Sequence, residues 1–273
     1  LPMGEGLGVR KSIMHIDHTW TDHFGARSEI PDNYNEAVIS LEGGNLRLNI
    51  ICRAYNEGIA VSYEFPEQPG TDSLTIKGEK TVFSFTGDHT AWSTARAQAA
   101  YSKRTVSTVE KGCERPLVIE IDSSLTVALA EAGLVDYARM KFDPDSSEAF
   151  SLRSRLDGPV KRKLPFRSPW RVIMIGNGPG DLLEKNYLLS NLNKPCAIDD
   201  ISWIKPGKAV REVTLTTIGA KSLVDFIAKH RLQYIEFDAG WYGYEYDDAS
   251  DARRVNLDPK RSKGPLDLRE VIK

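Results

Sequence analysis

The chain has little cysteine and no long apolar run, and each shortage excludes a class of protein. Its 273 residues contain only three cysteines, Cys52, Cys113 and Cys196, which lie far apart and form no Cys-x-x-Cys pair. So few and scattered cysteines provide neither a disulfide framework nor a structural zinc site. The sequence also has no stretch of ~18 apolar residues, so it predicts no transmembrane segment.

An excess of charge of one sign is also lacking. The 36 lysines and arginines are balanced by 38 aspartates and glutamates, which gives a net charge of −2. Nucleic-acid binders need a basic surface, and membrane-surface proteins need a polybasic segment, so this balance argues against both classes. The content of 41% hydrophobic and 27% charged residues is that of a globular protein, with one large domain or two ordinary ones.

Most of the chain up to residue 195 consists of short runs that alternate or are rich in β-branched residues. These runs are 45–55, 58–65, 74–77, 81–86, 117–121, 125–130, 150–156 and 170–175. Turn signals such as 42–44 and 56–58 separate them. Regular short strands divided by turns are typical of antiparallel sandwiches. We therefore expect residues 1–198 to form an N-terminal antiparallel β-sandwich.

The pattern changes after Pro206. Thr216 and Thr217 offer an N-cap, and apolar residues then recur at the spacing of one helix face: Ala220, Leu223, Val224, Ile227 and Ala228. A strand follows over 234–241, and another is expected within 202–215. Strand, helix and strand in this order predict a parallel pair, the unit of a β/α fold. Beyond a polar loop over 242–264, Asp267 offers the N-cap of a further helix.

Two parallel strands are too few to form a stable domain by themselves. We therefore expect residues 199–273 to be the beginning of a larger, truncated β/α barrel, in a chain that is mainly β. Residue 1 is Leu, and the final predicted helix stops within about two turns. Both observations favour a fragment of a longer protein.

Asp238 and Trp241 are candidate binding residues in the second part of the chain. Asp238 follows a predicted parallel strand, and β/α barrels build their active sites at the carboxyl ends of such strands. Trp241 offers a ring that can stack on a sugar or line a pocket. The alternative is an ordinary turn, since Asp and Gly often end strands.

Glu131 and His89 are candidates in the first part. Glu131 stands between small residues after a predicted strand, where a carboxylate can reach a hard cation such as Ca²⁺, although one carboxylate makes no site. His89 lies in the polar loop 86–92 and can contact a ligand or transfer a proton. The alternatives are a solvated glutamate and a histidine satisfied within its loop. His15, His18 and His23 share no strand or helix face and predict no metal cluster.

The chain resembles glycoside hydrolase family 97, the calcium-dependent bacterial α-glucosidases and α-galactosidases. Eight stretches along the chain carry this resemblance: Asp32-Asn-Tyr-Asn-Glu36, Tyr63-Glu-Phe-Pro66, Phe85-Thr-Gly-Asp-His89, Ala130-Glu-Ala-Gly-Leu-Val-Asp-Tyr137, Ser168-Pro-Trp-Arg-Val-Ile-Met-Ile175, Asn191-Leu-Asn-Lys-Pro-Cys196, Ser202-Trp-Ile-Lys-Pro-Gly-Lys208 and Phe237-Asp-Ala-Gly-Trp241. Each stretch is weak alone, but together they are specific in order and spacing.

The resemblance implies an N-terminal β-sandwich followed by a catalytic (β/α)₈ barrel. The family's catalytic carboxylates would lie beyond Lys273, so this chain alone would be inactive. Glu131 matches a calcium ligand of the family, which makes Ca²⁺ the expected cofactor. Asp238 and Trp241 match a segment near the sugar pocket, and with His89 they are the expected contacts to an oligosaccharide or α-glycoside.

The resemblance also sets the expected chemistry, which is cleavage of a glycosidic bond between two carboxylates. Some members of the family invert the anomeric centre and others retain it. The Asp-Ala-Gly-Trp form over 238–241 resembles the retaining, galactosidase-like branch. A periplasmic or outer-membrane location follows from the resemblance. The alternative is a non-catalytic carbohydrate-binding β-sandwich protein that functions as it stands.

Overall fold

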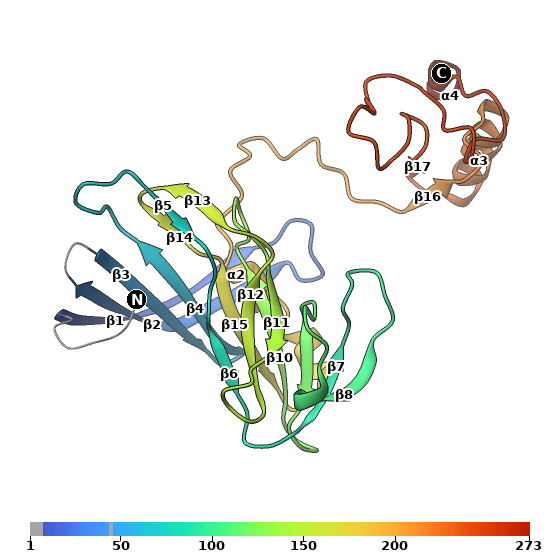
Figure 1. The fold of residues 1–273 in the computed structure, drawn as a ribbon. Helices are drawn as coiled ribbons and strands as arrows, with labels where there is room; N and C mark the ends of the chain where they lie inside the picture. The colour runs from blue at the N-terminus through green and yellow to red at the C-terminus, as the bar shows by residue number, and fades with distance from the viewer. Residues whose placement is uncertain (1–7, 44–45) are drawn as a thin grey trace. The chain divides into compact units, whose positions relative to one another are not determined.

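The computed structural model describes residues 8–43 and 46–273, and the chain divides into two compact units (Figure 1). These units are Leu1–Cys196 and Ala197–Lys273. Gly44 and Asn45, which the sequence places in a turn and at a strand start, lie outside the described residues. The candidate site residues are divided between these two units.

One large antiparallel sheet dominates the first unit. Its strands lie in the order β1 (Gly8–Thr21), β2 (Glu29–Gly43), β3 (Leu46–Tyr55), β4 (Gly58–Phe65), β15 (Trp170–Gly176), β10 (Thr126–Ala132), β9 (Leu117–Glu120), β7 (Thr90–Ser93) and β8 (Ser102–Thr105). The short strand β14 (Phe166–Arg167) also pairs with β4. Among the described residues, every pair in this sheet is antiparallel.

A second layer packs on one face of the large sheet. It contains β6 (Val82–Ser84), β11 (Met140–Pro144) and β12 (Ser151–Leu156), and a separate ribbon pairs β5 (Ser73–Ile76) with β13 (Val160–Lys163). Phe142 and Leu152 of this layer form one buried core with Leu117 and Leu129 of the large sheet. The 3₁₀ turn η1 (Val106–Thr108) adds Val106 to this core. The mainly β fold with antiparallel sheets is confirmed.

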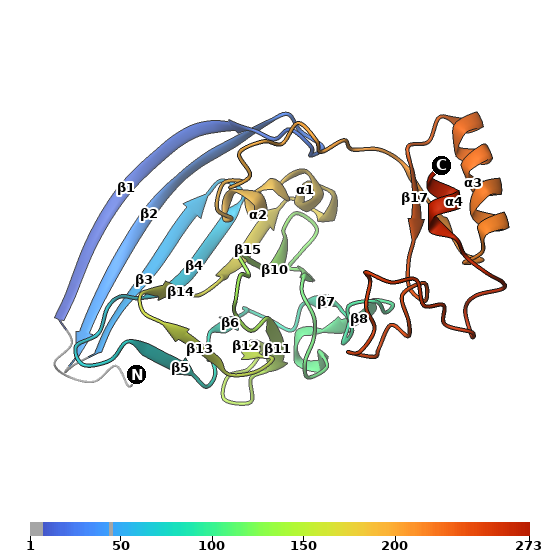
Figure 2. The same ribbon diagram turned by 90° about the horizontal axis from the view of Figure 1, so that it is seen from above.

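Two short helices cover part of the other face of the large sheet. They are α1 (Pro179–Glu184) and α2 (Tyr187–Asn191). Leu182 and Leu188 of these helices pack with Ala128, Ala130 and Trp170 in a second core. Figure 2 shows both helices beside β10 and β15. In the described part of the chain, their main strand contacts are with β15, β10 and β2.

The sequence pattern delimits no individual strand before residue 45, so the bounds of β1 and β2 were not predicted. They pair from Gly8↔Glu42 to Thr21↔Glu29, and Figure 2 shows them as long curved ribbons. Most described side chains of β1 are exposed, and Ile13 and Met14 are 67% and 49% exposed. Since neither face of β1 is fully buried, its sequence lacks the alternation that marks a half-buried strand.

The second unit contains a strand–helix–strand motif with parallel strands. β16 (Ala209–Glu212) pairs with β17 (Tyr234–Phe237), and α3 (Thr217–His230) connects them. The predicted cap of α3 is present, because Thr216 Oγ1 accepts a hydrogen bond from Gly219 N at 3.0 Å. Asp267 likewise caps α4 (Leu268–Ile272) by accepting from Arg269 N. Within the described residues, no helix is long and apolar enough to cross a membrane.

Candidate functional site

Glu131 lies near the end of β10, opposite Arg171 of β15 in the same sheet. Its carboxylate accepts a hydrogen bond from Arg171 Nη1 at 2.5 Å and from Met140 N at 3.2 Å. Arg115 Nε lies 3.1 Å from the other carboxylate oxygen. The Glu131 side chain is only 1% exposed, so its position is set by ionic partners rather than by solvent.

These contacts belong to a larger buried network, which we call the Glu131 cluster: Glu79, Glu114, Arg115, Glu131 and Arg171. Arg171 donates from Nε and Nη2 to the two oxygens of Glu79, at 2.7 and 2.6 Å. Arg115 donates to Glu114 at 3.1 Å. Burial disfavours the charge of Arg171, but the hydrogen bond and charge of Glu79 and the charge of Glu131 outweigh it, so the pKa of Arg171 is raised.

The described residues around Glu131 do not complete a calcium site by themselves. Ca²⁺ takes six to eight oxygen ligands, whereas both Glu131 oxygens already accept from two guanidinium groups and a backbone amide. No group of three or more His, Cys, Asp or Glu residues suited to a metal occurs in the ranges 8–43 and 46–273. The role of Glu131 as a calcium ligand therefore stays a prediction.

Asp238 and Trp241 lie in one loop directly after β17, at the carboxyl end of the parallel pair. The Asp238 carboxylate is 44% exposed and pairs with Arg211 of β16. Gly240 has φ of +91°, a conformation that favours glycine, so the chain turns sharply between Asp238 and Trp241. The Trp241 ring meets Tyr242 edge-on at 5.2 Å, and its carbonyl accepts from Asn256 N at 2.8 Å.

A further carboxylate, which sequence reasoning missed, stands at the end of the neighbouring strand. Glu212 is the last residue of β16 and is 4% exposed. Its oxygens accept from Thr214 N at 3.0 Å, Thr214 Oγ1 at 2.6 Å and Leu215 N at 2.5 Å. With its hydrogen bonds made inside its own loop, Glu212 positions the start of α3 rather than offering itself to a ligand.

His89 is held within its loop in the first unit. Its Nε2 lies 3.3 Å from Thr86 Oγ1, and its ring meets Phe85 edge-on at 6.5 Å. Its backbone carbonyl accepts from Val106 N at 3.0 Å. Of the predicted site residues, the structure thus brings Asp238 and Trp241 together, whereas Glu131 and His89 occupy separate places in the other unit.

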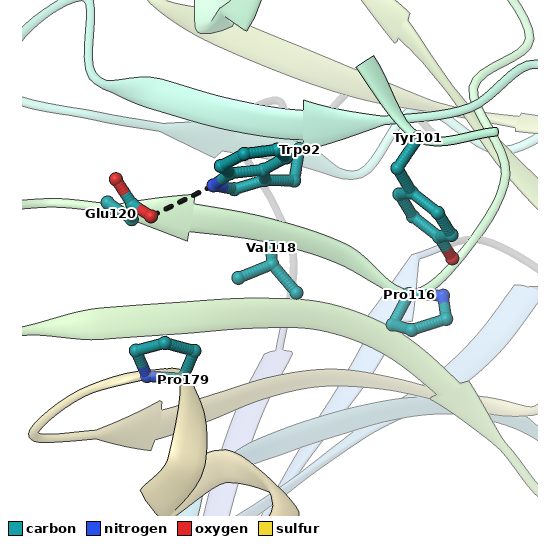
Figure 3. Close-up of a pocket in the computed structure, with 6 residues that line it drawn as sticks. All are labelled: Trp92, Tyr101, Pro116, Val118, Glu120 and Pro179. Carbon is teal, nitrogen blue, oxygen red and sulfur yellow. Dashed lines mark hydrogen bonds between the residues drawn. The ribbon is translucent and has the colours of Figure 1, made fainter. Parts of the chain in front are cut away.

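Sequence reasoning also missed a shallow pocket of about 320 Å³ on the first unit, which we call the aromatic pocket (Figure 3). Its lining comes from four segments that are distant in the chain: Trp92, Tyr101, Pro116, Val118, Glu120 and Pro179. Trp92 Nε1 donates to Glu120 Oε1 at 2.9 Å. Trp92 stands out in the loop 86–92, but no sequence spacing brings Tyr101 and Pro179 beside it.

A second pocket, of about 580 Å³, is basic. Arg53, Arg162, Arg167 and Lys194 line it together with Trp170. Each arginine lies near an acid, since Arg53 pairs with Glu36 at 2.8 Å, Arg162 with Asp136 at 3.2 Å and Arg167 with Glu64 at 4.0 Å. Burial lowers the pKa of Arg167. The pocket is therefore rich in paired charges rather than in free positive charge.

Comparisons with known proteins all find glycoside hydrolases. A family model described as the glycosyl-hydrolase 97 N-terminal domain matches residues 7–195. The retaining alpha-galactosidase of Bacteroides thetaiotaomicron is 23% identical over an alignment 319 residues long, and this alignment covers 96% of this chain and 45% of that protein. A probable retaining alpha-galactosidase of Streptomyces bingchenggensis is 26% identical over 226 residues, and the alignment covers 73% of this chain and 32% of that protein.

Solved structures agree with these relatives. A glycoside hydrolase family 97 enzyme from Pseudoalteromonas sp. strain K8, in complex with panose, has a TM-score of 0.77 and is 25% identical. The match covers 87% of this chain and 40% of that one, and a complex with acarbose matches equally well. A beta-arabinopyranosidase at 18% identity and a TM-score of 0.65 shares the fold.

The chain spans less than half the length of these relatives. The matched residues 7–195 nevertheless make up well over half of this chain. The chain belongs to glycoside hydrolase family 97, and residues 7–195 are its N-terminal domain.

Proposed function

We propose that this chain is the N-terminal part of an enzyme that cleaves α-galactosidic bonds with retention, with α-glucosides as the second substrate class. The match of residues 7–195 to the family's N-terminal domain carries the proposal. The choice of galactosides and of retention rests on the names of the two relatives, both retaining alpha-galactosidases.

The catalytic carboxylates belong, in this proposal, to barrel strands after Lys273. The chain covers 45% of the Bacteroides relative, which leaves room for a full barrel there. The parallel pair β16–β17 with α3 is the repeating unit of such a barrel. Retaining glycosidases place their two carboxyl groups ~5–5.5 Å apart, so that one attacks the anomeric carbon and the other protonates the leaving oxygen.

Asp238 and Trp241 take the role of substrate contacts. They follow a parallel strand at its carboxyl end, where β/α barrels gather their binding groups. Asp238 is exposed enough to accept a hydrogen bond from a sugar hydroxyl, while Arg211 holds its charge in place. The Trp241 ring offers an apolar face to a pyranose. His89 is a third proposed contact, and its polar loop supports this role only by composition.

Calcium dependence and a periplasmic or outer-membrane location remain parts of the proposal that rest on family resemblance. The residues described here do not make a calcium site by themselves, so we assign no step of the reaction to the metal. What this chain contributes in the proposal is a rigid sandwich and the first substrate-facing loop of the barrel.

The stereochemical course of the natural full-length protein tests the proposal. We expect it to hydrolyse 4-nitrophenyl α-D-galactopyranoside faster than the corresponding α-glucoside. Proton NMR should show α-galactose as the first product, before mutarotation, because a double displacement retains the anomeric configuration. β-Galactose as the first product would contradict the retaining assignment, and the absence of any α-glycosidase activity would contradict the function itself.

A further inference from the structure

The aromatic pocket lies on a stretch of sheet that the helices leave uncovered. Val118 of β9 faces the same side as the core beneath α1 and α2, and Trp92 of β7 is its direct partner in register. Pro179, the first residue of α1, forms one border of the pocket, and Tyr101 and Pro116 stand at the opposite border (Figure 3). The pocket is therefore the continuation of a sheet face whose other half is packed.

The two aromatic side chains that line the pocket are partly exposed. Trp92 is 36% exposed and Tyr101 is 49% exposed. Aromatic rings gain much free energy when they are buried, so two partly exposed rings that line one apolar pocket favour a binding partner there. With Val118 and two prolines, they give the pocket a mainly apolar floor.

A carboxylate in the pocket and an ammonium group beside it indicate which kind of ligand the pocket can bind. The Glu120 carboxylate receives the Trp92 Nε1–H at one oxygen, which fixes the ring and leaves the second oxygen to accept from a hydroxyl. Lys103, the register partner of Trp92 on β8, places its Nζ 5.7 Å from the Trp92 ring centroid and is a donor beside the ring. One acceptor and one donor of opposite charge favour a neutral ligand that both donates and accepts hydrogen bonds.

A pyranose has these properties. One face of its ring presents C–H groups that pack on an aromatic π-face, and its edge carries hydroxyls that donate and accept. A volume of about 320 Å³ is at the lower end for small-molecule sites, which suits a sugar residue or two rather than a long chain. We propose that the aromatic pocket is a binding site for a neutral oligosaccharide, with Trp92 as the stacking platform.

This inference rests on the proposed function only in the choice of sugars, namely α-linked gluco- and galacto-oligosaccharides. The site itself belongs wholly to the first unit, and it is carried by Trp92, Tyr101 and Glu120. It gives the N-terminal domain a function of its own, namely binding a glycan, whatever residues perform hydrolysis.

Isothermal titration of the 273-residue chain with raffinose and with maltotriose tests the proposal. We expect a dissociation constant of about 1 mM for at least one of the two sugars. Trp92→Ala should weaken binding at least ten-fold, whereas Trp92→Phe, which keeps an aromatic face, should lose less. Trp203→Ala is the matched control, because Trp203 is 68% exposed in the other unit, and it should leave the affinity unchanged.

Circular dichroism of each variant shows whether its fold is kept. Unchanged affinity in a folded Trp92→Ala variant would overturn the proposal. So would the absence of binding to both sugars at concentrations ten-fold above the expected dissociation constant. If the chain associates with itself and Trp92→Ala abolishes this association, the pocket is an interface to a second copy of the chain, and the sugar proposal is wrong. Hydrolysis by the full-length protein is measured separately, so failure of this site and failure of the proposed function are distinguishable.

Discussion

At the scale of single residues, the surroundings of the Glu131 carboxylate are set by partners that are distant in the sequence. Glu131 was predicted from its own segment, and it does lie near a strand end. Its partner Arg171 comes from a strand forty residues later, and Glu79 is farther still from Arg171 in sequence. Spacing along one strand identifies a candidate carboxylate, but only the sheet register shows that arginines already surround it.

Glu131→Gln should lower the free energy of unfolding of the first unit by about 3 kcal/mol. The change removes a buried charge and leaves Arg171 and Arg115 with less compensation in a site that excludes water. Urea unfolding measures the loss. Glu42→Gln is the control, because Glu42 forms an exposed pair with Arg47 and should cost less than about 0.5 kcal/mol. Equal effects of the two substitutions would show that the Glu131 cluster is not structural.

Asp32 should make stability depend on pH in the direction opposite to most carboxylates. Burial raises the pKa of Asp32 above 3.8, although His18 and Arg53 oppose the shift. Its Oδ1 is buried without a hydrogen-bond partner in the described part of the chain. The folded state thus holds this proton more tightly than the unfolded chain does. Its stabilisation is complete below pH 3.8 and is lost as pH rises through the folded-state pKa.

Asp32→Asn should therefore gain stability relative to the natural chain between pH 3 and pH 7. Thermal or urea unfolding at the two pH values measures the difference. Asp122→Asn should behave in the opposite way, because hydrogen bonds from Ser124 lower the pKa of Asp122. Its contribution is present above pH 3.8 and is lost as pH falls. The same sign for both variants would contradict this description of Asp32.

At the scale of elements, sequence patterns succeed where apolar residues recur with a regular period. The helix α3 was predicted from its apolar stripe and its Thr216 cap, and both are present. The strands β3, β4, β10 and β15 also match predicted runs. The bounds of β1 were not predicted from the sequence, because this strand is largely exposed. The helix α2 was missed because its five residues show no helical period.

Thr216→Ala should destabilise the second unit by about 1 kcal/mol. The substitution removes the hydroxyl that accepts from Gly219 N and leaves an amide of the first helical turn without this partner. Thr216→Ser keeps a hydroxyl and should retain most of the stability. Unfolding followed by circular dichroism at 222 nm compares the variants. Loss in both variants alike would show that the methyl contact, and not the cap, matters.

At the scale of the whole molecule, the order of units was inferred from a change in pattern near Pro206, and the structure divides the chain at Cys196 and Ala197. The aromatic pocket could not be predicted, because it assembles Trp92, Tyr101 and Pro179 from separate segments. The family resemblance, by contrast, was readable from short motifs, and the match over residues 7–195 confirms it.

Calcium should have little effect on this chain alone. Arg171 and Arg115 occupy the Glu131 carboxylate, and the described residues provide no further cluster of ligands. A ligand that binds only the folded state raises the melting temperature. We therefore expect 1 mM CaCl₂ to leave the melting temperature within about 1 °C of its value in EDTA. A rise of several degrees would show that the chain forms a calcium site by itself.

Hydrolysis of 4-nitrophenyl α-D-galactopyranoside, measured side by side for the 273-residue chain and the natural full-length protein, tests the central claim most directly. The account predicts that the full-length protein releases nitrophenol and that the chain does not, because the proposal assigns the catalytic carboxylates to barrel strands after Lys273. Release by the chain itself, at a rate that follows its concentration through purification, would contradict the account.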